Sequence, residues 1–336
     1  MPSTYKDIQR LTGLSLSTIS KYLNGGNVLE ENARAIDSAI ETLDFRVNEF
    51  ARGLKTRRSK TVGVLIPELN STFNTTIIAD IEDLLRKNGY GAIVCDCRMD
   101  KAMEKDALDF LLGKMVDGII NIPFDGSGEH LTGANLRDIP VVLLDRPVSK
   151  YGFDTILVDN FAASRRAAWE FARHGHRRAA ILCGSEESYT MSERMRGFDA
   201  GLREYGMDRG PGSVVKVGHT IDGGYEGAKR LLGSLRRPTA VFCANYEITV
   251  GTIIAVNELG LKIPDELSII GFDNLTLSQI IRPQLTIVAQ PMRRMAETAS
   301  KLLLFRMKGN TPDPAVRTLP LSFISGASVA RLREMS

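Results

Sequence analysis

Side chains suited to reading DNA bases gather near the N-terminus, in a segment predicted to form a short helix. Its outer face carries apolar, hydroxyl and ammonium groups, namely Leu16, Ser17, Thr18 and Lys21. Such groups at the N-terminal end of a helix can contact base edges when the helix lies in the major groove of DNA. The segment is therefore a candidate recognition helix.

Two short helices joined by a tight turn would position this face. Thr4 followed by Asp7 is typical of a capping box at the start of the first helix, and Gly13 should end that helix. Ser15 can cap the second helix, whose inner face is apolar around Ile19. The pattern predicts a helix-turn-helix, and a generic helical hairpin is the alternative interpretation.

Positive charge is concentrated in the same part of the chain. Residues 1–60 contain ten Lys and Arg against seven Asp and Glu, whereas the rest of the chain contains 33 of each kind. Five basic residues fall close together: Arg52, Lys55, Arg57, Arg58 and Lys60. A basic run neutralises DNA phosphates and makes binding salt-dependent. A solvated linker between domains is the other interpretation of this run.

Two further elements complete the N-terminal region. Apolar residues at positions 33, 36, 40 and 43 predict an amphipathic third helix. Residues 48–56 form a candidate hinge helix, in which Gly53 costs about 1 kcal/mol relative to Ala. An isolated helix this short should be largely unfolded. We therefore predict a helix-turn-helix head at residues 1–47, and a hinge at 48–60 that orders when two chains and DNA meet.

From residue 61 onward, short β-branched runs alternate with helical stretches. Strands are expected at 62–66, 92–95, 118–122, 141–144 and 155–158, and again at 179–183, 214–217, 240–243 and 267–272. Helices are expected between them, for example at 76–88, 161–173, 194–205 and 224–235. Apolar strands separated by helices are typical of parallel sheets covered on both faces. The pattern predicts an α/β domain at 61–331, made of two doubly wound lobes with a ligand cleft at the strand C-termini.

Polar and aromatic side chains follow the predicted strands where such a cleft would lie. Asp145 and Arg146 follow one strand and Asp273 follows another, while Phe73 and Asn74 lie in the loop after the first strand. Carboxylates and guanidinium groups can bond sugar hydroxyls, and an aromatic ring can stack on the apolar face of a sugar. Either aspartate, taken alone, is equally typical of a turn or a helix cap.

Other classes of protein find little support in the sequence. It contains no Gly-x-Ser-x-Gly elbow, no Walker phosphate loop and no cluster of metal ligands, so no enzyme, metal or cofactor site is expected. Cys95 and Cys97 lack a partner pair at zinc-site spacing, which favours buried cysteines. The absence of a membrane-spanning run and of a secretory core indicates a cytoplasmic protein. A secreted sugar-binding protein would not account for the head.

Ordered motifs run along nearly the whole chain. In the N-terminal part they are Tyr5-x-Asp7-Ile8, Gly13-Leu14-Ser15-x-x-Thr18-Ile19-Ser20-Lys21, Asn24, Asn48, Ala51-Arg52-x-Leu54 and Thr61-Val62-Gly63-Val64. Later ones include Val116-Asp117-Gly118, Val158-Asp159-Asn160, Gly175-His176-Arg177, Arg194-x-x-Gly197-Phe198, Gly271-Phe272-Asp273 and Pro283-x-Leu285-Thr286. Together they resemble the lactose-repressor (LacI/GalR) family of bacterial transcription regulators. The resemblance implies a periplasmic-binding-protein-like domain in which the chain crosses between the lobes three times.

The resemblance also implies functional residues. DNA contacts are expected from Tyr5, Ser15, Leu16, Ser17, Thr18, Lys21 and Asn24 in the head, and from Arg52, Leu54, Lys55 and Arg57 in the hinge. Besides Arg146, the effector cleft is expected to be lined by Phe73, Asn74, Asp145, Ser188, Thr190, Arg194, Asp273 and Gln290. For Arg194 a surface salt bridge is the alternative, and Asp159 with Asn160 looks more like a helix cap.

The chain departs from the family's usual pattern at two of these positions and at one further position near the cleft. Lys21 stands where arginine is usual, and lysine lacks the planar fork that pairs with guanine. Asn74 and Tyr246 replace residues that are common around the cleft. These departures bear on the operator and the effector rather than on the fold.

We therefore expect a ligand-responsive DNA-binding transcription regulator, a repressor of carbohydrate-metabolism genes. Effector binding between the lobes should change its affinity for double-stranded operator DNA. A homodimer is expected because residues 327–335 carry no leucine heptad of the kind that forms tetramers. A regulator of the same architecture that responds to a nucleobase, a sugar phosphate or a protein partner is the alternative.

Overall fold

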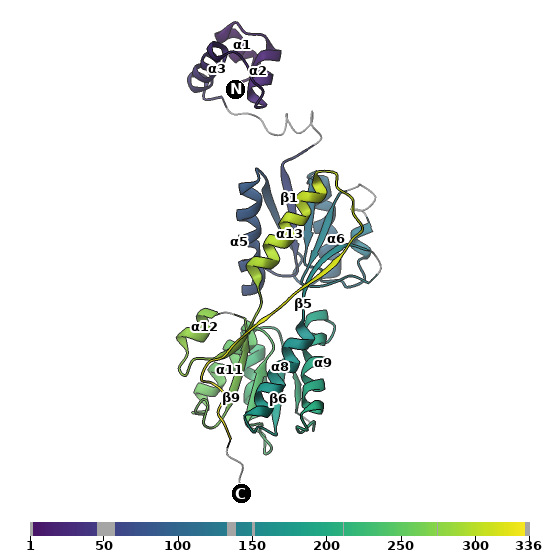
Figure 1. Cartoon of the computed structure of the whole chain (residues 1–336), viewed down its shortest axis with the longest axis vertical. Coiled ribbons are helices and arrows are strands. Elements are labelled where there is room, and N and C mark those ends of the chain that lie inside the picture. The colour runs from purple at the N-terminus through teal and green to yellow at the C-terminus, as the bar shows by residue number, and fades with distance from the viewer. Residues whose placement is uncertain are drawn as a thin grey trace. The chain divides into compact units, whose positions relative to one another are not determined.

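The computed structural model describes residues 3–45, 58–132, 139–149, 152–210, 212–273 and 275–332. Its contacts divide the chain into two units, Met1–Ser59 and Lys60–Ser336. Figure 1 shows the first unit as a cluster of helices and the second as an α/β body with two lobes. The expected hinge helix at 48–56 and its proposed contacts Arg52, Leu54, Lys55 and Arg57 lie outside the described residues.

The head consists of α1 (Tyr5–Thr12), α2 (Leu16–Leu23) and α3 (Glu30–Leu43). The Thr4 backbone N–H donates to the Asp7 carboxylate at 2.9 Å at the start of α1. Gly13 ends α1 with a φ of 68°, a left-handed conformation that favours glycine and turns the chain toward α2. Each helix buries one isoleucine completely in a shared core: Ile8, Ile19 and Ile36. The predicted head helices are therefore present.

The first lobe is built on a parallel sheet in the order β11-β5-β4-β3-β1-β2. Its strands are β1 (Thr61–Ile66), β2 (Gly91–Asp96), β3 (Gly118–Asn121), β4 (Val141–Leu144), β5 (Asp154–Val158) and β11 (Val316–Leu319). One face packs against α5 (Thr72–Lys87) and α13 (Met292–Met307), as Figure 1 shows. The other face packs against α6 (Lys101–Gly113) and the short helix η1 (Glu129–Leu131).

The second lobe repeats this plan with the sheet order β12-β10-β9-β8-β6-β7. Its strands are β6 (Ala179–Cys183), β7 (Val214–Lys216), β8 (Ala240–Cys243), β9 (Ser268–Phe272), β10 (Thr286–Ala289) and β12 (Ser322–Ile324). One face packs against α8 (Asn160–Arg173) and α9 (Tyr189–Glu204), and the other against α10 (Ile221–Leu232) and α11 (Tyr246–Glu258). A short helix, α12 (Leu275–Ile280), precedes β10. Only β12 among these strands runs antiparallel to its neighbour.

The chain passes between the lobes three times: after β5, after β10, and between β11 and β12. The predicted architecture of two doubly wound lobes is confirmed. The four helices predicted with bounds all begin earlier than predicted, α8 at Asn160, α10 at Ile221 and, by the widest margins, α5 at Thr72 and α9 at Tyr189. Ser71 and Ser188 are the N-cap residues of α5 and α9, and the first turns of these two helices mix polar with apolar residues, so they lack the apolar periodicity on which the prediction depended. Within the described ranges, no helix combines the length and apolar character needed to cross a membrane.

Helices α8 and α9 approach each other closely at Gly197. A β-carbon on this glycine would lie 2.1 Å from the carbonyl oxygen of Phe161 and 2.9 Å from its Cα. One turn later, a β-carbon on Gly201 would lie 2.6 Å from that of Ala168. Because the nearest obstacle at Gly197 is backbone, no side-chain movement can make room there.

Gly197→Ala should therefore lower the free energy of unfolding by about 1–3 kcal/mol, the usual cost of overpacking. Gly113→Ala, at the end of α6, is the matched control because no atom lies within 4 Å of its β-carbon position. It should be neutral or slightly stabilising. Urea denaturation of both variants measures the difference, and an equal loss in the two would contradict the packing argument.

Two buried histidines, one in each lobe, resist protonation. His130 is 8% exposed and His176 is 1% exposed, and burial lowers the pKa of each to about 4. An unfolded chain protonates histidine near pH 6.5. Below that pH the unfolded state binds protons that the folded state does not, so the stability falls as the pH falls toward 4.

His176 should lower the free energy of unfolding by about 2 kcal/mol between pH 7 and pH 5. His176→Gln should reduce the total loss over that range by this amount, whatever its stability at pH 7. Urea denaturation at the two pH values provides the measurement. If the variant and the parent lose the same stability, His176 does not carry this pH dependence.

Candidate functional site

A shallow depression on the head is lined by side chains of α1, of α2 and of the residue that ends α2. They are Tyr5, Leu16, Ser17, Ser20, Lys21 and Asn24. All except Ser20 are among the residues expected to contact DNA. Ser20 was missed, although its position three residues after Ser17 places it on the same helix face. The expected base-reading side chains therefore share one concave surface.

Ser15 and Thr18, the other two contacts expected in the head, lie at the N-terminal end of α2. The Ser15 hydroxyl accepts the Thr18 backbone N–H at 3.2 Å and lies 2.9 Å from the Thr18 hydroxyl. It also lies 2.7 Å from the Ser17 hydroxyl. These contacts fix the first turn of α2, and Leu16 remains 40% exposed beside them. The end of the helix thus presents hydroxyls and one apolar side chain.

A second concave site lies between the two lobes of the larger unit. The first lobe contributes Glu68, Ser71, Phe73, Asn74, Asp145 and Arg146, and the second contributes Thr190, Met191, Arg194, His219, Asn245, Tyr246, Glu247 and Asp273. Gln290, which follows β10, completes the lining. The cleft therefore brings together every expected effector residue except Ser188. The Ser188 hydroxyl lies 3.1 Å from that of Thr190, at the start of α9.

Seven lining residues were not among the expected effector contacts, although Tyr246 had been placed near the cleft: Glu68, Ser71, Met191, His219, Asn245, Tyr246 and Glu247. Phe73 and Asn74 lie in the first turn of α5 and not in the loop after β1, where the sequence analysis had placed them. Glu68 lies in that loop and Ser71 caps the helix, so their position directly before Phe73 was a signal that could have identified them. His219 and Glu247 follow β7 and β8, where the sequence offered no reason to prefer one residue over its neighbours.

Two aspartates follow central strands and lie deep in the cleft. Asp145 comes directly after β4 and Asp273 directly after β9, with φ values of 66° and 59°. Left-handed backbone is uncommon for residues other than glycine and clusters at functional sites. Burial raises the pKa of both carboxyl groups, that of Asp273 to about 6. The Gln290 side-chain amide donates to Asp273 at 2.9 Å and its backbone N–H donates at 3.2 Å.

Arg194 is buried beneath these aspartates rather than lying in a surface salt bridge, since only 3% of it is exposed. Its Nε donates to Asn160 Oδ1 at 2.8 Å, and its Nη1 donates to the carbonyl of Ala244 at 2.5 Å. The guanidinium lies 3.6 Å from the centre of the Phe272 ring. Burial lowers the pKa of Arg194, and the charges of Asp273 and Asp145 oppose that shift. Asn160 is thus a support for Arg194, and its neighbour Asp159 is the cap of α8.

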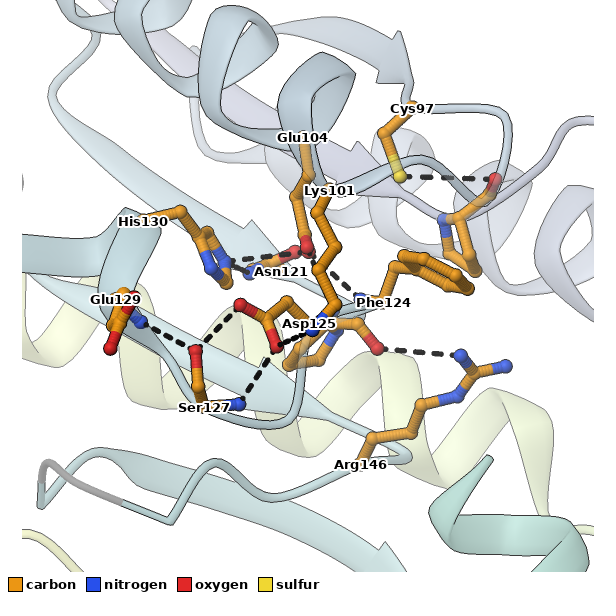
Figure 2. A network of polar contacts seen from close by, with 12 residues as sticks. Cys97, Lys101, Glu104, Asn121, Phe124, Asp125, Ser127, Glu129, His130 and Arg146 are labelled. Carbon is orange, nitrogen blue, oxygen red and sulfur yellow. Dashed lines mark hydrogen bonds and ion pairs between the residues drawn. The ribbon is translucent and has the colours of Figure 1, made fainter. Parts of the chain in front are cut away.

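Arg146 is supported from the first lobe by a loop that a buried glutamate holds in place. Arg146 Nη1 donates to the carbonyl of Pro123 at 3.4 Å. The next two backbone N–H groups, of Phe124 and Asp125, each donate to the Glu104 carboxylate at 2.8 Å, as Figure 2 shows. Glu104 is fully buried, and the sequence analysis did not identify it. It positions the loop against which Arg146 rests.

Three buried polar atoms at the cleft have no hydrogen-bond partner within the described part of the chain: Asp145 Oδ1, Arg146 Nε and Gln290 Oε1. Arg146 Nε lies 3.7 Å from Asp145 Oδ2, which is an ion pair without a short hydrogen bond. Buried polar groups are almost always hydrogen-bonded, so each exception needs an explanation. Two acceptors and one donor facing the same cleft are the complement of a polar ligand.

A hydrogen bond joins the two lobes beside the cleft. The backbone N–H of Thr72, in the first turn of α5, donates to Glu247 Oε1 at 3.1 Å. Glu247 itself lies in the first turn of α11. The bond therefore links the N-terminal ends of two helices from opposite lobes, where a carboxylate is favoured by the exposed N–H groups.

No metal centre competes with this interpretation in the described ranges, which hold no group of three or more His, Cys, Asp or Glu side chains able to bind an ion. Cys97, Cys183 and Cys243 are buried free thiols, as predicted, whereas Cys95 is only half-buried because it lies on the edge strand β2.

Comparison with known proteins identifies the family. Residues 168–329 match the periplasmic binding protein-like domain family. Catabolite control protein A of Priestia megaterium is 33% identical over 322 residues, which cover 95% of this chain and 97% of that protein. The ribose operon repressor of Haemophilus influenzae is 30% identical, over 95% of this chain and 96% of that protein.

A solved structure has the same fold over nearly the whole chain. The lac repressor dimer bound to operator and an anti-inducer superposes with a TM-score of 0.89 at 23% identity, covering 98% of this chain and 100% of that chain. At this identity the likeness bears on the fold alone. Because relatives at least 30% identical extend over almost all of its length, the chain belongs to the lactose-repressor (LacI/GalR) family of bacterial transcription regulators.

Proposed function

We propose that this protein binds operator DNA through α2 as a homodimer, and that a small polar effector bound between its lobes changes that affinity. Membership in the family makes the chain a ligand-responsive DNA-binding transcription regulator and not an enzyme, as predicted. The domains would be a head at 1–47, a hinge at 48–60 and an effector domain at 61–331. The protein would act in the bacterial cytoplasm, where its operator DNA lies.

The depression on the head supports the assignment of α2 as the recognition helix. Its exposed end presents Leu16, Ser17 and Lys21 on one surface. A recognition helix contacts base edges with the residues near its N-terminus. Dimers of such heads bind paired half-sites, which accords with a near-palindromic operator.

The unpartnered atoms of Asp145, Arg146 and Gln290 are the observation that carries the effector site. They lie where strands of both lobes end, the place where open α/β sheets bind ligands. A ligand bonded to both lobes would favour one angle between them and so bias the geometry that the hinge transmits. Hydroxyl groups, which both donate and accept, fit these atoms, and this supports a carbohydrate effector over the alternatives of a nucleobase, a sugar phosphate or a protein partner.

Lys21→Ala should cost about 1–3 kcal/mol of operator affinity and relax selectivity at one operator position. Selection from randomised DNA duplexes with the parent and the variant, followed by titration on the selected sites, measures both effects. Arg34→Ala is the matched control, because Arg34 carries the same charge on α3, outside the depression, and is ion-paired with Glu30. A uniform loss on all sequences for Lys21→Ala would reassign Lys21 to the phosphate backbone.

Effector affinity should be about tenfold weaker at pH 5 than at pH 7, if the effector donates to Asp273, since that carboxyl has a pKa raised to about 6. Lowering the pH protonates Asp273, which then loses part of its acceptor capacity. The neighbouring groups Arg194 and Gln290 favour the charged form, and Asp145 opposes it. Calorimetry with a sugar found by thermal-shift screening of the full chain provides the measurement.

Asp273→Asn should weaken binding of that sugar at pH 7 by tenfold or more and flatten its pH dependence. Operator affinity without effector should be unchanged, because Asp273 lies outside the head unit. Normal sugar affinity in this variant would place the effector site elsewhere.

A further inference from the structure

The mouth of the cleft carries a carboxylate from each lobe. Glu68 follows β1 in the first lobe, and Glu247 lies in the first turn of α11 in the second. Both line the cleft. Glu247 Oε1 accepts the Thr72 N–H, while the Glu68 carboxylate has no hydrogen-bond partner among the residues the structure describes. Both side chains therefore have acceptor capacity left for a ligand.

The charges that line the cleft are unequal. Four carboxylates, of Glu68, Asp145, Glu247 and Asp273, stand against two guanidinium groups, of Arg146 and Arg194. Arg194 donates hydrogen bonds to Asn160 and to the carbonyl of Ala244, and Arg146 donates one to the carbonyl of Pro123. Both guanidinium groups therefore use part of their donor capacity within the protein. A phosphate or carboxylate entering this cleft would meet an excess of like charge.

We propose that the effector carries a positively charged amino group, which Glu68 and Glu247 bind from opposite lobes, beside hydroxyl groups that bind deeper in the cleft. This inference rests on the proposed function, because it takes the effector site to be this cleft. An independent observation supports a ligand with donors: Asp145 is only 5% exposed and its Oδ1 has no partner in the described chain. A divalent cation is disfavoured, since the described side chains include no group able to hold a metal.

A cation at this position would also act on the angle between the lobes. Burial raises the pKa of Glu68, and the charge of Glu247 raises it further, whereas Arg146 lowers it. The two carboxylates therefore repel each other across the cleft when both are charged. An ammonium group between them replaces that repulsion with two attractions and draws the lobes together. The amino group would thus contribute to the regulatory response as well as to recognition.

A panel matched in shape and varied in charge tests the proposal. Glucose, galactose and mannose are each offered to the full chain as the free sugar, the 2-amino sugar, the N-acetylated amino sugar and the 6-phosphate, with thermal shift and calorimetry at pH 7. At least one amino sugar should bind tenfold or more tightly than its neutral and phosphorylated counterparts. That preference should weaken as the salt concentration rises, because it rests on charge.

Glu68→Gln and Glu247→Gln should each weaken binding of the amino sugar far more than binding of its neutral counterpart, so that most of the preference for the amino form is lost. Glu82→Gln is the control, because Glu82 lies on the exposed side of α5, is paired with Arg86 and does not line the cleft. The proposal is overturned if no amino sugar binds, if a neutral or phosphorylated form binds equally well, or if Glu68→Gln keeps the preference. A neutral sugar that changes operator affinity would then still support the proposed function, whereas operator affinity that no sugar alters would count against that function itself.

Discussion

The buried guanidinium group of Arg194 constrains the structure of the second lobe. Removing a cation from water is costly unless hydrogen bonds and neighbouring charges replace its hydration. For Arg194 these come from Asn160, the carbonyl of Ala244 and the ring of Phe272. The three partners belong to α8, to the residue after β8 and to β9, so one side chain requires all three elements to meet. The close approach of α8 and α9 at Gly197 is part of the same requirement.

The buried charge of Arg194 also determines what its neighbours can do. It favours the ionised form of Asp273 against the burial that opposes it. Asp273 in turn accepts from Gln290, the residue that follows β10 just before the chain crosses to α13 in the other lobe. A ligand that bonds Asp273 therefore acts next to a connection between the lobes. Ligand binding in the cleft and the relative position of the lobes are therefore coupled through directly adjacent contacts, and no long pathway of residues is needed.

The sequence was sufficient to predict the parts of the fold that depend on periodic patterns. Apolar strands alternating with helices indicated two parallel sheets, and strand ends drew attention to Asp145 and Asp273, which the structure places in the lining of one cleft. The start of α9 at Tyr189 was missed because a helix that begins with polar residues shows no apolar periodicity there. Glu104 and Glu247 could not have been found, since their roles depend on backbone N–H groups of distant loops and helices, and such partners leave no mark in the local sequence.

The three crossings between the lobes have a consequence for how the chain is made. The first lobe begins with β1, but α13 and β11 arrive only after the whole second lobe has been synthesised up to β10. Until then, the face that will receive Met295, Leu302 and Leu303 is covered by α5 alone. The sheet of the second lobe is also incomplete until then, because its edge strand β12 lies at 322–324. Both sheets are thus completed by strands that leave the ribosome almost together, so a nascent chain exposes apolar surface in each lobe until its last strands emerge.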